Sequence, residues 1–145
     1  MDSLIEDMTG GHVAEVKIVL TSIVAALAIY QAFLMAVGYG KVRMRLLGSR
    51  AASFTHRSTG DAIVPLTLLI SIMCLGYFGI EDGLEHAPPP VALHMISGLL
   101  LLVVLAVKIA VVRWWHSMGR FLPVLGISVL TLFLITWLSS AGVYL

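Results

Sequence analysis

Two copies of one short pattern, His56-x-x-x-Gly60 and His94-x-x-x-Gly98, hold the residues of this chain that are best suited to chemistry. In a helix, positions i and i+4 lie one above the other on the same face. Each imidazole would therefore lie beside a bare patch of backbone at the glycine. A flat macrocycle can rest against such a patch, and haem is the usual flat macrocycle between membrane helices. The pattern predicts histidines that ligate haem iron and glycines that contact the macrocycle.

The composition places these histidines in a membrane protein. Of 145 residues, 59% are hydrophobic and 12% charged, and the mean hydropathy is +1.01. Four apolar runs, at about 18–37, 62–80, 93–112 and 121–142, are each close to the ~20 residues that cross ~30 Å of hydrocarbon. Because the runs are continuous rather than alternating, they favour helices over strands. We predict an all-α, integral membrane four-helix bundle that forms a single transmembrane domain over residues 1–145.

Charged residues between the runs predict the orientation. The first and third connections are basic and hold Lys41, Arg43, Arg45, Arg50, Arg57, Arg113 and Arg120. The second connection holds Glu81, Asp82 and Glu85, with no Lys or Arg. Because basic loops stay on the cytoplasmic side, both termini are predicted to lie outside. The acidic beginning of the chain is unlike a signal peptide, which begins with a basic stretch.

Depth in the membrane separates the two histidine patterns. With a rise of ~1.5 Å per residue, His56, just before the second span, and His94, at the outer end of the third, lie about 25–30 Å apart. One haem cannot take both as axial ligands. His116 comes down the third helix to about the depth of His56, so these two could ligate an inner haem. An outer haem would pair His94 with a ligand that the sequence leaves open among His86, His12 and Met73.

Cations near the inner end of the third span have two interpretations. The side chain of Lys108, about one turn before Arg113, can reach the interface along its own stem. Its ammonium can instead pair with an anion, either Asp61 or a haem propionate, or with a quinone carbonyl. We take Arg57, Lys108 and Arg113 as the candidate propionate partners. Hydroxyl side chains on the fourth run, namely Thr131, Thr136, Ser139 and Ser140, are expected to form interhelical hydrogen bonds.

The same residues resemble those of a known class of protein. His56-Arg57-x-x-Gly60 entering a span, followed by His94-x-x-x-Gly98, Lys108 and Arg113, resembles small bacterial four-helix cytochrome b-type membrane proteins. The ending, Leu122-Pro123-x-x-Gly126 with Thr136-Trp137-Leu138-Ser139-Ser140-Ala141, is similar to an uncharacterised family of that kind. The resemblance runs from about Gln31 onward. A weaker similarity is to four-helix cytochrome oxidase assembly proteins, which place histidines at the ends of their middle helices.

The resemblance implies one or two haem b groups in a multi-pass protein of the bacterial inner membrane. It implies that His56 and His94 are the ligands, whereas His116 depends on the depth argument alone. Quinone, other redox-complex subunits or a periplasmic cytochrome would be the redox neighbours. Membrane lipid surrounds such a chain, a second copy could complete a ligand set, and no nucleic-acid partner is expected.

Two functions are therefore carried forward from the sequence. The first is an electron-transfer component rather than a stand-alone enzyme, because 145 residues leave no room for a flavin or nicotinamide domain. The second is a haem-free scaffold or assembly subunit of a respiratory complex. In the second case the histidines are polar residues at a wet boundary, and Gly60 and Gly98 serve only close helix packing.

Overall fold

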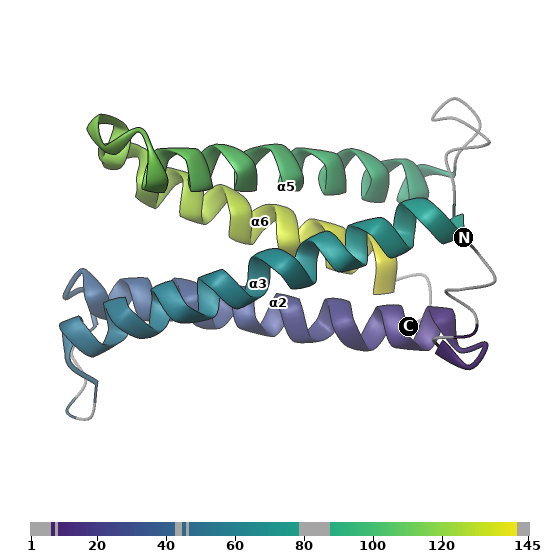
Figure 1. Ribbon diagram of the computed structural model, residues 1–145, viewed down its shortest axis with the longest axis horizontal. Helices are drawn as coiled ribbons and strands as arrows, with labels where there is room; N and C mark the ends of the chain where they lie inside the picture. Colours follow the sequence, from purple (N-terminus) through teal and green to yellow (C-terminus); the bar gives the residue numbers. More distant parts are fainter. Residues whose placement is uncertain (1–6, 8, 43–44, 46, 79–87, 142–145) are drawn as a thin grey trace. The chain divides into compact units, whose positions relative to one another are not determined.

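Helices make up the protein in the computed structural model, which describes residues 7, 9–42, 45, 47–78 and 88–141. The long helices are α2 (Val13–Gly38), α3 (Ser49–Phe78), α5 (Pro89–Arg113) and α6 (Leu122–Ala141), with a short 3-10 helix, η1 (His116–Phe121), before α6 (Figure 1). Four segments of the described residues, one for each long helix, are long and apolar enough to cross a membrane. The predicted all-α class with four spans is confirmed.

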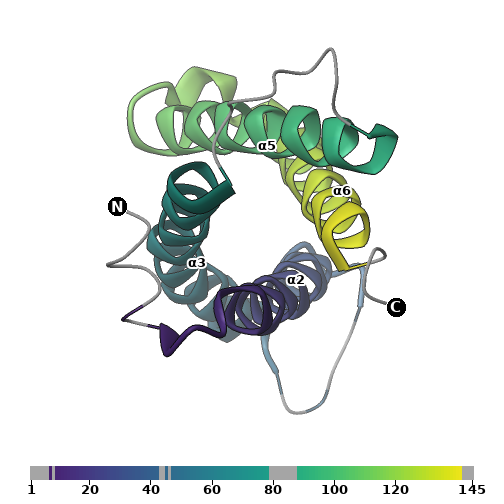
Figure 2. The same ribbon diagram turned by 90° about the vertical axis from the view of Figure 1, so that its right-hand side faces the viewer.

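The chain divides into two units, Met1–Ile80 and Glu81–Leu145, and each contains one helical hairpin. In the first hairpin α2 packs against α3, and in the second α5 packs against α6, with η1 at the turn (Figure 2). The single transmembrane domain, the four-helix bundle and the orientation of the termini stay predictions.

The helices extend beyond the apolar runs, most of all in α3. This helix begins at Ser49, well before the predicted start near residue 62, so its first turns carry Arg50, His56 and Arg57. Polar residues such as arginine form helix readily, so hydropathy locates the membrane-crossing part of a helix and not its end. His56 therefore lies two turns inside α3, ahead of the apolar run that begins near residue 62. The predicted ends at residues 80 and 142 lie outside the described residues.

A small buried cluster fixes α2 against α3 near the turn of the first hairpin. Leu34 and Val37 of α2 and Ala52 of α3 are 0–3% exposed, and Leu47 packs on them. The two helices can approach closely there because Ala52 is small. Since Gln31 lies one turn before Leu34 and His56 one turn after Ala52, the same cluster sets the register of the first histidine site.

Many large apolar side chains face outward on both hairpins. Examples are Ile29 on α2, Ile72 on α3, Leu99 on α5 and Ile127 on α6, which are 54–67% exposed. Lipid tails are as apolar as these side chains, so exposure to hydrocarbon costs little. The distribution is that of helices whose outer faces meet lipid.

Candidate functional site

His94 lies near the beginning of α5 and contacts the last turns of α6. Its Nδ1 is 3.0 Å from the backbone oxygen of Thr136. A carbonyl oxygen only accepts hydrogen bonds, so Nδ1 carries a proton in this contact, and in the neutral imidazole Nε2 then has the lone pair. Ser139 Oγ lies 3.4 Å from the same Nδ1 and donates to the Thr136 carbonyl at 3.1 Å.

Hydroxyl groups complete the contact between α5 and α6. The Ser97 side chain, which is only 2% exposed, donates to the backbone oxygen of His94 at 3.2 Å. The Thr136 hydroxyl donates to Ser97 Oγ at 3.0 Å. The predicted interhelical role of the fourth-run hydroxyls is thus confirmed for Thr136 and Ser139. Thr136 and Ser139 are thus the residues that face the Nδ1 edge of His94.

His56 occupies an equivalent position in the first hairpin. Its Nδ1 is 3.2 Å from the backbone oxygen of Gln31 on α2, which again places the proton on Nδ1. In return, Gln31 Nε2 donates to the backbone oxygen of His56 at 2.9 Å and to the hydroxyl of Thr59. The Thr59 hydroxyl donates to the carbonyl of Thr55 at 2.6 Å. A reciprocal pair of hydrogen bonds therefore joins Gln31 and His56.

The two sites share one construction, which extends the sequence pattern. A hydroxyl residue stands at i+3 in both, so the repeat is His-x-x-Thr-Gly at residues 56–60 and His-x-x-Ser-Gly at 94–98. In both, the histidine Nδ1–H donates to a backbone carbonyl on the neighbouring helix of the same hairpin. The i+3 hydroxyl could have been found by aligning the two copies, whereas Gln31 gave no signal beyond being polar in an apolar run.

The glycines of the pattern face the neighbouring helix. A Cβ atom at Gly60 would lie 3.9 Å from Gln31 Nε2, and one at Gly98 would lie 3.9 Å from Thr136 Cγ2. Each glycine thus contributes to packing within its own hairpin, which favours the close-packing interpretation. Contact of either glycine with a macrocycle stays a prediction.

Alanine at either glycine should be tolerated if packing is the whole role. At 3.9 Å the new Cβ makes an ordinary van der Waals contact, and alanine is favoured over glycine in a helix by roughly 0.5–1 kcal/mol. We expect Gly60→Ala and Gly98→Ala to unfold in detergent at or above the wild-type temperature. Gly38→Ala is the matched control, because its Cβ would lie 3.1 Å from Ser53 Oγ, and it should be the least stable of the three. A well-folded Gly98→Ala protein that has lost a bound chromophore would instead support macrocycle contact.

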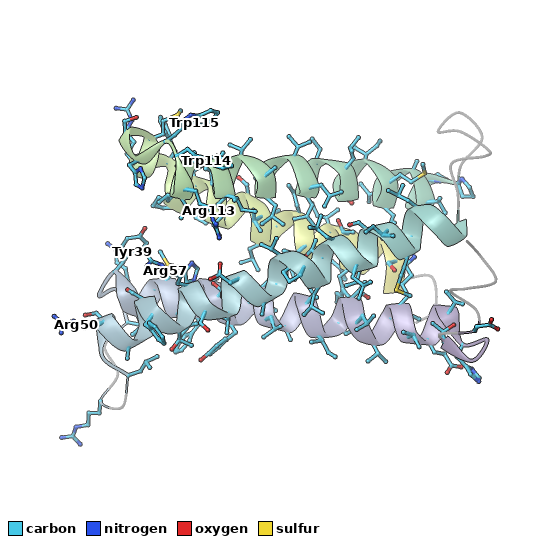
Figure 3. All side chains as sticks on the ribbon, viewed as in Figure 1. Tyr39, Arg50, Arg57, Arg113, Trp114 and Trp115 are labelled. Atoms are coloured by element: carbon cyan, nitrogen blue, oxygen red, sulfur yellow. The ribbon has the colours of Figure 1, made fainter. Side chains whose placement is uncertain are left out.

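Two of the three predicted cations, Lys108 and Arg113, lie far from His94 along the same helix. Lys108 is half-buried and Arg113 is exposed, at the opposite end of α5. From His94 to Lys108 is about 21 Å along the helix axis, and His116 is further still. These residues could assist only a ligand at the turn of the second hairpin. Figure 3 shows Arg113 at that turn, and Arg57 with Arg50 and Tyr39 at the turn of the first hairpin.

Pairing of His56 with His116 stays a prediction, because the two residues belong to different hairpins. The same holds for Met73, on α3, as a partner of His94. His12 is exposed and its Nδ1 lies 3.4 Å from Glu15 Oε2, whereas His86 lies outside the described residues. Among the residues that the structure describes, no three His, Cys, Asp or Glu side chains gather in a metal-binding group. Haem iron, by contrast, takes only one or two axial ligands from a protein.

The comparison with known families covers nearly the whole chain. Residues 5–145 match a family of unknown function, DUF6529. The chain belongs to this family. No curated protein and no solved structure matches it. Both copies of the histidine pattern lie within the DUF6529 region, so the two sites are part of the DUF6529 domain and not of an appended segment.

Proposed function

We propose that this chain is an integral-membrane b-type haem protein that carries electrons within or to a membrane redox complex, with His56 and His94 as axial ligands. One observation carries the proposal: both histidines donate Nδ1–H to a backbone carbonyl of a neighbouring helix. Metal-ligating histidines almost always hold their second ring nitrogen in such a bond, which fixes the ring orientation and raises ligand basicity. The donor chemistry therefore fits a haem ligand.

The remaining residues support the histidines in two ways. The carbonyls of Gln31 and Thr136 orient the two rings, and the hydroxyls of Thr59 and Ser97 tie the same helices together. When bound, haem supplies a one-electron redox centre. Gly60, Gly98, Arg57, Lys108 and Arg113 are further candidates for contact with the macrocycle or its propionates, and His116 is a candidate inner ligand.

Partners follow from the chemistry of one-electron transfer. The Nδ1 edge of His94 faces a carbonyl and a hydroxyl within its own hairpin. The second axial ligand of a haem bound at His94 would be His86, or His12 or Met73 of the first hairpin, or would come from a second copy of the chain or from another subunit. Electrons would enter and leave through quinone, a periplasmic cytochrome or a redox-complex subunit in the bacterial inner membrane.

The absorption spectrum of the purified protein tests the proposal. Protein extracted from haem-replete cells should show a Soret band, and its α and β bands should sharpen on reduction with dithionite. The pyridine haemochrome of the same sample should give one or two haem b groups per chain. A colourless preparation of folded protein from such cells would contradict the proposal.

A second candidate, a haem-free scaffold or assembly subunit, is favoured by the packing of the glycines. Gly60 and Gly98 already lie against side chains of the neighbouring helix, as small residues do when their task is helix association. In that case the hydrogen bonds of His56 and His94 serve only to hold the two helices of each hairpin together. Substitution of the histidines separates the two functions.

A further inference from the structure

The turn of the second hairpin combines cations with exposed aromatic side chains. We call Arg113, Trp114, Trp115, Arg120 and Phe121 the basic–aromatic turn. Trp114 is 72% and Trp115 53% exposed, and the Arg120 guanidinium carbon lies 4.8 Å from the centre of the Phe121 ring. Arg113, Trp114 and Trp115 lie together where α5 ends (Figure 3). Exposed tryptophan and arginine at the end of a membrane helix are typical of the lipid headgroup level.

The charges of this turn have no acidic residue near them in the sequence. Residues 86–145 contain Lys108, Arg113 and Arg120 but no Asp or Glu. The first hairpin differs, because Arg57 has Asp61 one turn away on the same helix, a spacing at which opposite charges attract. The acidic residues of the same unit, Glu81, Asp82 and Glu85, precede α5 and lie at least 28 residues before Arg113 in the sequence, so the turn itself contains cations and no Asp or Glu.

We propose that the basic–aromatic turn binds the headgroup phosphate of anionic phospholipid. Arg113 and Arg120 would contact the phosphate, while the indole rings of Trp114 and Trp115 lie at the boundary between headgroups and hydrocarbon. Each Lys or Arg near an anionic membrane surface strengthens binding to that surface by about fivefold. The proposal does not depend on haem; if it holds, Arg113 contacts a lipid headgroup, and Arg57 and Lys108 are left as the candidate propionate partners.

Fluorescence quenching by brominated lipid tests the proposal on the full chain. The chain has three tryptophans, so a Trp137→Phe protein reports only from Trp114 and Trp115. It is reconstituted in phosphatidylcholine vesicles with equal mole fractions of brominated phosphatidylglycerol or brominated phosphatidylcholine. We expect stronger quenching by the brominated phosphatidylglycerol. Adding Arg113→Gln and Arg120→Gln should lower this preference by about fivefold for each cation.

The matched control removes a cation elsewhere. Lys17→Gln changes the net charge by one unit on α2, outside the turn, and should leave the preference unchanged. Equal quenching by the two brominated lipids would overturn the proposal, and that comparison needs no arginine variant. An unaltered preference in the double variant with wild-type helicity would also overturn it. Loss of the preference on adding inorganic phosphate at constant ionic strength would identify a site for free phosphate in place of a lipid surface.

Discussion

Substitution of His94 by asparagine is expected to abolish haem binding at that histidine while the α5–α6 hairpin stays folded. The asparagine side-chain N–H can take the place of Nδ1–H and donate to the Thr136 carbonyl, so the bond between the helices is kept. The Nε2 ligand atom is lost. Because removing only an outer-shell partner of a metal ligand lowers metal affinity by about 10–100-fold, loss of the ligand itself should be at least as severe. Haem content and the reduced spectrum measure the effect.

The equivalent changes at other histidines complete this experiment. His56→Asn should remove the haem on the first hairpin or convert it to the high-spin state. His116→Asn should have the same effect only if His116 is the second ligand of that haem. His12→Asn is the control, since His12 is exposed and lies beside Glu15. If His94→Asn and His56→Asn both keep the wild-type spectrum, haem ligation by these residues is wrong. If the purified chain contains no haem and both variants still assemble into the parent complex, the scaffold function is favoured.

The Leu34→Ala substitution is expected to produce the largest loss of stability in the first hairpin. Leu34 is 0% exposed and packs with Val37 and Ala52, so alanine would remove contacts and leave a cavity. Large-to-small changes at buried positions of water-soluble proteins cost about 2–5 kcal/mol, and we expect the lower end of that range here, because detergent tails rather than water meet the side chain after the helices separate. The free energy of unfolding in mixed detergent, followed by circular dichroism, checks this value.

An exposed residue on the same helix gives the comparison for Leu34. Ile29 is 54% exposed on α2, and Ile29→Ala should change the free energy of unfolding by about 0.5 kcal/mol or less. Equal effects of the two substitutions would show that the buried cluster does not hold α2 against α3. Because Gln31 and His56 lie one turn from this cluster, Leu34→Ala should also weaken haem retention at His56, whereas Ile29→Ala should not.

The apolar runs predicted the four helices well because a membrane span leaves a strong signal in composition. The extent of α3 was not predictable in this way, since its first turns carry Arg50, His56 and Arg57 and lie outside the apolar run. Hydropathy reports where a helix meets lipid. It does not report where backbone hydrogen bonding begins.

Half of each histidine site could be found from the sequence. His94 and Gly98 share a face by spacing alone, and the hydroxyls of Thr136 and Ser139 were predicted to bond to another helix. The bond between His56 and Gln31 was not predicted, because it depends on the rotation and register of two packed helices. In helices that are apolar nearly all round, no amphipathic face indicates which side meets the neighbour. Small residues and buried clusters such as Leu34 with Ala52 set that register.

The placement of each histidine bond within a single hairpin has a genetic consequence. The Nδ1 bond of His56 joins α3 to α2, and that of His94 joins α5 to α6, so a break of the chain between Phe78 and Pro88 would part neither pair. The two hairpins could be encoded as separate genes, or exchanged between relatives, with each histidine keeping its carbonyl partner. A single chain supplies the two hairpins in equal number.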